Sequence, residues 1–146
     1  MSLIVGTNSW CSIGEADSYL TNKRNAYEWF NLGDTDDPGV ICKTSLLVSA
    51  YRRLINSAEF NIASSSTDDN VKNAQIEMAW FLYKHGEEIE EREGARASGL
   101  ASFRLGKRSE TLRKDYTDIP SYIADMLTEY IQGFNTTVDL KGEYDV

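Results

Sequence analysis

The chain has 146 residues, of which 41% are hydrophobic and 11% aromatic, and its formal net charge is −8 at pH 7. This length corresponds to about one domain, and the apolar content is enough for a hydrophobic core, which excludes a wholly disordered chain. No apolar run approaches the ~18 residues of a membrane-spanning helix, and the first residues lack the basic flank and long apolar run of a secretory signal, so we expect neither membrane insertion nor export.

Cysteine and histidine are too scarce for most metal and hydrolytic chemistry. Cys11 and Cys42 are too few for a disulfide framework and lack the spacing of a zinc site, so we expect both thiols to be reduced and structural. The single histidine, His85, excludes chemistry that needs two imidazoles. The sequence therefore predicts a protein that is not an enzyme and that has no cofactor, no metal site and no catalytic residues.

The charge is unevenly distributed along the chain. Residues 92–114 contain seven basic and two acidic side chains, a net charge of +5, which leaves −13 on the remainder. A net negative charge argues against a generic nucleic-acid binder, because phosphate contacts need an excess of Lys and Arg. The basic segment is compatible with a solvated loop or with a charged surface that contacts a partner.

Two capping patterns and a proline place the first helices. Ser12 and Glu15 have the spacing of a capping box and predict a helix over 12–25, followed by a helical turn in the apolar cluster that Gly33 ends. Asp37 followed by Pro38 predicts the start of a second helix over 38–57.

A third helix is expected over 68–85, with Gly86 as its stop. His85 then lies in the last turn, where a structural role near the negative end of the helix dipole is favoured over a catalytic one. The acidic run that follows, over 87–93, is interpreted as a solvated segment in preference to a metal or carboxylate site.

Glycines at 94, 99 and 106 argue against a continuous helix, and the alternation over 100–105 favours an extended arm or a hairpin. A last amphipathic helix is expected over 119–133, opened by Asp118 and Pro120. Its apolar stripe could dock on the chain's own core or on a neighbouring copy. Its candidate docking residues are Tyr122, Ile123, Met126 and Tyr130.

The predicted fold class is mainly α: a small bundle of three to four helices with an extended or hairpin arm before the last helix. We divide the chain into a helical core domain (1–86), a charged glycine-containing arm (87–117), a C-terminal amphipathic helix (118–134) and an acidic tail (135–146). The expected core residues are Tyr19, Leu20, Trp29, Leu47, Tyr51, Leu54, Met78, Phe81 and Leu82.

The order of these features resembles a known family over roughly residues 5–115. The stretches that carry the resemblance are Ile13-Gly14-Glu15-Ala16-Asp17-Ser18-Tyr19-Leu20, the Trp29 region, Leu46-Leu47-Val48-Ser49-Ala50-Tyr51-Arg52-Arg53-Leu54, and Val71-Lys72-Asn73-Ala74-Gln75-Ile76-Glu77-Met78-Ala79 before a basic stretch with glycine and serine. The chain resembles the small head-tail connector (adaptor) proteins of tailed bacteriophages, including the group catalogued as DnaT-like single-stranded DNA-binding proteins. The long helix at 119–133 and its tail have no place in the family's common core.

The resemblance implies a structural subunit without catalysis that joins a homo-oligomeric ring beneath the portal and links the DNA-filled head to a neck or tail component. It implies a location in the virion neck, and in the host cytoplasm during assembly. The 94–112 segment would face neighbouring subunits or the DNA channel, and our candidates for inter-subunit or DNA-proximal contacts are Arg96, Arg104, Lys107 and Arg108. The alternative function is single-stranded DNA binding through the basic segment 92–114, where aromatic rings lie near cations.

Overall fold

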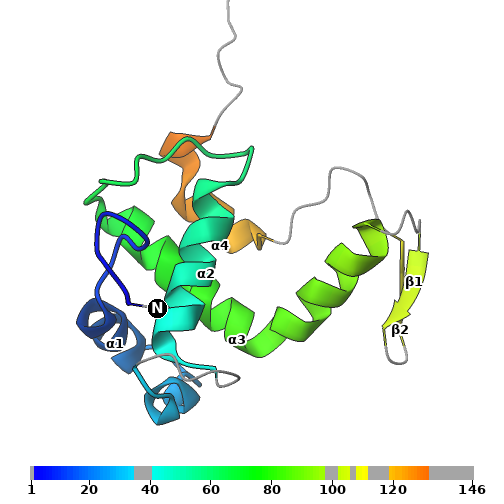
Figure 1. Cartoon of the computed structure of the whole chain (residues 1–146), viewed down its shortest axis with the longest axis horizontal. Coiled ribbons are helices and arrows are strands. Elements are labelled where there is room, and N and C mark those ends of the chain that lie inside the picture. The colour runs from blue at the N-terminus through cyan, green and yellow to red at the C-terminus, as the bar shows by residue number, and fades with distance from the viewer. Residues whose placement is uncertain (1, 35–40, 98–101, 106–107, 112–118, 132–146) are drawn as a thin grey trace, which may run out of the picture.

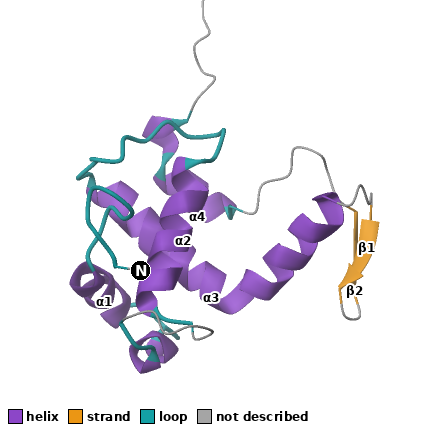
Figure 2. Cartoon of the chain, viewed as in Figure 1, coloured by secondary structure: helices purple, strands orange, loops and turns teal. Residues whose placement is uncertain are grey.

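The computed structural model describes residues 2–34, 41–97, 102–105, 108–111 and 119–131. The protein is mainly helical, which confirms the predicted fold class (Figures 1 and 2). In chain order the elements are α1 (Ile13–Thr21), the 3-10 helix η1 (Tyr27–Asn31), α2 (Lys43–Ile55), α3 (Asp69–Ala97), β1 (Ser102–Leu105), β2 (Arg108–Thr111), α4 (Ser121–Met126) and the 3-10 helix η2 (Thr128–Tyr130).

The predicted capping box opens α1. Ser12 Oγ accepts a hydrogen bond from the Glu15 amide at 3.1 Å, and Glu15 Oε1 accepts one from the Ser12 amide at 2.9 Å. Glu15 Oε2 also lies 2.9 Å from Lys72 Nζ, so the same side chain ties α1 to α3. The helix ends at Thr21, short of the expected residue 25, with Asn22 as its C-cap, and Asn25 then adopts a left-handed conformation (φ 66°) before η1.

The expected start of α2 is wrong in position, since 41 and 42 are not helical and the helix begins at Lys43. Cys42 is its cap: the thiol accepts a hydrogen bond from the Ser45 amide, and Ser45 Oγ accepts one from the Cys42 amide. The Asp37 and Pro38 pair that was expected to open this helix lies outside the described residues. Both cysteines are free and buried, and burial raises the pKa of the Cys11 thiol to about 12.

The prediction that Gly86 ends the third helix is wrong, because α3 continues to Ala97. A glycine in the interior of a helix lowers the stability of the helix by about 1 kcal/mol. The residues after Gly86 favour helix, however, and Ile89 is completely buried, so packing stabilises the helix on both sides of Gly86. Residues 87–97, predicted as the beginning of the arm, are therefore helical; we call them the distal limb. Figure 1 shows that α3 changes direction along its length.

Between α3 and α4 the chain forms the hairpin version of the predicted arm. β1 and β2 pair antiparallel, with Ser102 opposite Thr111 and Leu105 opposite Arg108. The hairpin lies beside the far end of α3, away from α1 and α2 (Figure 1).

The core joins α1, α2, α3 and α4. Seven of the nine expected core residues are buried, and Tyr19 and Phe81 pack against the core while partly exposed. Trp10, Ile76 and Ile89 are fully or almost fully buried and were not expected in the core. Trp10 packs on Tyr51 with ring centroids 4.5 Å apart.

A buried glutamine organises this core. Gln75, in α3, is completely buried, and its Oε1 accepts hydrogen bonds from the backbone amides of Trp10 at 2.9 Å and Cys11 at 3.2 Å. Its Nε2 donates to Ser9 Oγ and to the Leu47 carbonyl of α2, both at 2.8 Å. One side chain thus joins the N-terminal segment, α2 and α3.

A second polar cluster joins α1 to α3. Glu77 is 7% exposed, accepts a 2.7 Å hydrogen bond from the Tyr19 hydroxyl and lies 3.0 Å from Lys23 Nζ. Burial and this hydrogen bond raise the pKa of Tyr19 far above its usual value, so the phenol stays neutral and donates.

The last predicted helix is shorter than expected. α4 ends at Met126, because the chain leaves the helix to pair with an earlier loop: the Asn61 amide donates to the Tyr130 carbonyl, and Ile131 bridges to Phe60. Ile123 and Leu127 are completely buried against the chain's own core. The Tyr130 hydroxyl donates to Asp68 Oδ2 at 2.5 Å and so holds the end of η2 against the start of α3.

Gln75→Met should lower the free energy of unfolding by about 2 to 3 kcal/mol, because it leaves buried backbone groups without their partner. Urea unfolding at neutral pH measures this loss. Asn70→Ala, at an exposed position in the first turn of α3, is the control and should change stability by less than about 0.5 kcal/mol. An equally small effect of Gln75→Met would show that the core does not depend on this amide.

Tyr130→Phe should raise the pKa of Asp68, because the tyrosine hydroxyl is the main cause that holds this pKa below its ordinary value of 3.8. A carboxyl whose pKa is lowered by folding stabilises the fold above its unfolded pKa and loses that contribution as the pH falls through the folded pKa. The stability deficit of the variant should therefore be present at neutral pH and shrink as the pH falls below 3.8. NMR titration of the Asp68 carboxyl measures the pKa, with Tyr27→Phe, an exposed tyrosine, as the control.

Candidate interaction groove

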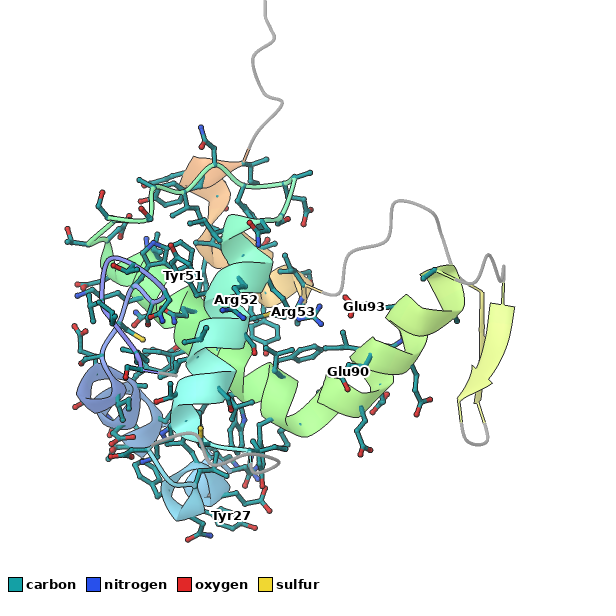
Figure 3. All side chains as sticks on the ribbon, viewed as in Figure 1. Tyr27, Tyr51, Arg52, Arg53, Glu90 and Glu93 are labelled. Carbon is teal, nitrogen blue, oxygen red and sulfur yellow. The ribbon has the colours of Figure 1, made fainter. Side chains whose placement is uncertain are left out.

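A groove of about 760 Å³ lies between α2 and the distal limb of α3. Its lining residues come from α2 and from α3, and the ribbons of these two helices diverge along the second half of α3 in Figure 3. Leu46 and Leu82, each less than 10% exposed, lie at its apolar base, and Ile41, which is 55% exposed, lies at its α2 end. This is the size of a site that holds several side chains of a ligand or partner.

The α2 wall of the groove is polar because the helix presents a stripe at helical spacing. Ser45 and Ser49 are four residues apart, and Arg52, Arg53 and Asn56 continue the stripe toward the end of α2. The opposite face of α2 carries the core leucines, so the helix is amphipathic in the usual way and its polar face becomes one side of the groove.

The limb wall is acidic. The four glutamates that line it are Glu87, Glu88, Glu90 and Glu93. Glu88 lies near both Arg92 and His85, and Glu93 is paired with Arg53. The acidic run is helical, and Glu87, Glu90, Glu91 and Glu93 are exposed to solvent, as expected of a solvated segment.

An ion pair spans the groove from wall to wall. The Arg53 guanidinium donates to both carboxylate oxygens of Glu93, at 2.9 and 3.1 Å, although the two residues are 40 positions apart in the chain. Figure 3 shows the two labelled side chains facing one another between α2 and the limb. The bidentate geometry fixes the limb relative to α2 and so sets the width of the groove.

His85 lies at the base of the limb, and not in a last helical turn, because α3 continues beyond it. Its ring packs on Phe81 with centroids 4.8 Å apart, and Nδ1 is 3.4 Å from Glu88 Oε1. Its side chain is 46% exposed. In the described ranges no group of three His, Cys, Asp or Glu side chains converges as a metal site.

The four candidate basic residues lie on more than one element. Arg96 belongs to the end of α3, Arg104 to β1 and Arg108 to β2, while Lys107 lies outside the described residues. Arg104 is opposite Ser109 and Arg108 is opposite Leu105, so the two arginines occupy successive register positions, which alternate between the faces of a sheet.

The candidate docking residues of the last helix divide into two kinds. Ile123 is completely buried, and Met126 and Tyr130 are partly buried against the core. Tyr122 is 47% exposed and is the member of this set that stays available at the surface.

The groove itself was not expected from the sequence. Its two walls lie far apart in the chain, and it exists only because α3 continues past Gly86. The spacing of Ser45, Ser49 and Arg53 along one helical face was the available signal for its α2 wall.

Comparison of the chain with protein-family models, with curated proteins and with solved structures finds no match in any of the three. Over the described segments, no helix is both long enough and apolar enough to cross a membrane.

Arg53→Glu should loosen the distal limb, because it places two like charges where the ion pair spans the groove. Exposed ion pairs of this kind contribute up to about 1 kcal/mol to the free energy of unfolding, so the loss of global stability should be small. The backbone amides of 87–97 should nevertheless exchange faster with solvent. Hydrogen exchange followed by mass spectrometry measures this. Arg52→Glu is the control on the same helix, and the double variant Arg53→Glu with Glu93→Arg should restore protection. Unchanged exchange in Arg53→Glu would mean that the limb is held by its packing alone.

Proposed function

We propose that the protein is a structural head-tail connector (adaptor) subunit of a tailed phage or prophage. It forms a homo-oligomeric ring under the portal and joins the DNA-filled head to a neck or tail component. The protein then resides in the neck of the virion, and in the host cytoplasm during assembly.

The observation that carries this proposal is that one small subunit has two different surfaces, one of which is hollow and the other projecting. The groove lies between α2 and the distal limb, and the β1–β2 hairpin lies beyond the end of that limb (Figure 1). A ring needs a heterologous interface, in which one surface of each subunit meets a different surface of the next and the rotation closes. The helix order and the motifs around Glu15 and Arg52 supply the resemblance to connectors.

The chemistry of the described surfaces favours a structural role over catalysis. The shifted pKa values have structural causes: burial is the main cause for Cys11 and Tyr19, and hydrogen bonds within two pairs are the main cause for Glu15 with Lys72 and for Asp68 with Tyr130. The groove combines an apolar base with paired and unpaired charges, which suits contact with another protein.

Single-stranded DNA binding is the second candidate, and the hairpin arginines favour it. Stacking rings and cations near one another are what such binding needs, and Phe103 precedes Arg104 in β1. The net charge of −8 and the acidic limb oppose it, because both repel phosphates.

The wild-type protein, free of DNA, should form a discrete species of many subunits. Light scattering behind a sizing column measures its mass over a wide range of concentration, and negative-stain microscopy shows whether the species is a closed ring. A closed ring keeps a constant mass where an open chain grows with concentration. A monomer at every concentration, with an affinity for single-stranded DNA that falls steeply with salt, would contradict the proposal and support the second candidate.

A further inference from the structure

We propose that copies of this chain exchange their distal limbs, so that residues 87–97 of one copy lie against α2 of a second copy, in the place of that copy's own limb. The docking surface is the α2 wall of the groove, and its occupant is the segment that already lies there within one chain. Exchange can be reciprocal between two copies or can pass from each subunit to the next around a ring, so the proposal does not depend on the proposed function.

The match between the limb and α2 is visible within one chain. The Arg53 guanidinium donates to both carboxylate oxygens of Glu93, at 2.9 and 3.1 Å, and Figure 3 shows these side chains facing one another. Ile89, on the same limb, is completely buried and belongs to the hydrophobic core. A second copy offers the same arginine and the same core. A limb that docks on it therefore makes the contacts that it makes on its own chain, which is the basis of domain swapping.

The two walls that would meet are opposite in charge. α2 contains no acidic residue, and both Arg52 and Arg53 line the groove. The limb side is lined by four glutamates. Arg52, Glu87 and Glu90 are exposed, and within the described part of the chain none of the three forms an ion pair. Attraction between a limb and the α2 of another copy is therefore not limited to one ion pair, and it sets the orientation in which they meet.

Gly86 supplies a hinge between the limb and the body. A Cβ added at this helical position would meet no atom within 4 Å outside the adjoining backbone, so no close approach requires a glycine there. Glycine in a helix interior nevertheless leaves the backbone more conformational freedom than any other residue. Figure 1 shows that α3 changes direction along its length. A change of direction at Gly86 moves the limb as one unit and leaves the first part of α3 in the core.

The polar contact that holds the limb on its own chain is open to solvent. The side chains of Arg53 and Glu93 are 27% and 46% exposed, and exposed ion pairs contribute little to stability. The closed chain and the exchanged copies make the same contacts, and they differ in the direction of the limb at the hinge. Protein concentration therefore decides between the two forms by mass action.

The length of the chain beyond the limb permits the exchange. α4 packs on the core through Ile123, which is completely buried. Residues 98–101 and 112–118 join the limb, the hairpin and α4, and this length of chain can reach at most about 36 Å. The limb itself is about 16 Å long. A limb can therefore dock on a second copy while α4 stays on its own core.

The test mixes two variants, neither of which can form the ion pair alone. Arg53→Glu brings two carboxylates together, and Glu93→Arg brings two guanidinium groups together, both in the closed chain and in an exchange between identical copies. In a mixed pair, each limb meets the opposite charge on the other copy. The equimolar mixture should therefore associate at least tenfold more tightly than either variant alone. Sedimentation velocity measures association, and circular dichroism verifies that each variant is folded.

A matched mixture controls for net charge. Glu91→Arg makes the same change of charge as Glu93→Arg, but Glu91 is exposed on the limb and does not line the groove. Arg53→Glu mixed with Glu91→Arg should associate no more tightly than Glu91→Arg alone. Hydrogen exchange identifies the segment in contact: the amides of 87–97 in Glu93→Arg should regain protection when Arg53→Glu is added, which association through another surface would not produce.

The outcomes separate limb exchange from the proposed function. If the test mixture associates no more tightly than its components and the limb amides gain no protection, limb exchange is wrong, and wild-type rings would still stand. If the mixture associates with a protected limb while the wild type forms no species larger than a dimer, limb exchange holds and the ring is wrong. Equal association in the test mixture and in the Glu91→Arg mixture would assign the effect to net charge and overturn limb exchange.

Discussion

The buried amide of Gln75 is the constraint on which the rest of the molecule depends. From the second turn of α3, it joins the backbone amides of Trp10 and Cys11 to the Leu47 carbonyl of α2. A buried polar group without partners is costly, so these hydrogen bonds are satisfied in one arrangement of the three segments and in few others. The fixed crossing of α2 and α3 that results determines where the distal limb leaves the body.

The distal limb extends α3 beyond the core and forms one wall of the groove. Because α3 continues past Gly86, its glutamates form a wall opposite the polar face of α2, and the bidentate contact between Arg53 and Glu93 holds the two walls together. The same continuation carries the hairpin away from α1 and α2 (Figure 1). A groove and a projecting hairpin are therefore two consequences of one uninterrupted helix.

Local signals in the sequence predicted the local structure well. The spacing of Ser12 and Glu15 predicted the cap of α1, and apolar periodicity predicted most of the core. Predictions failed where distant contacts override local preference. Burial of Ile89 carries α3 through a glycine that usually ends a helix, and pairing of Tyr130 with Asn61 ends the last helical segment early. The groove could not be predicted, because no local pattern records that α2 and residues 87–93 face one another.

The central claim is that the Gln75 amide fixes the crossing of α2 and α3, and so fixes where the distal limb leaves the body. Hydrogen exchange of the Gln75→Met variant, followed by mass spectrometry, tests this claim most directly. The account predicts that the amides of α2 and of residues 87–97 exchange faster with solvent than in the wild type, whereas Asn70→Ala leaves the exchange of both segments unchanged. Wild-type exchange over both segments in Gln75→Met would contradict it.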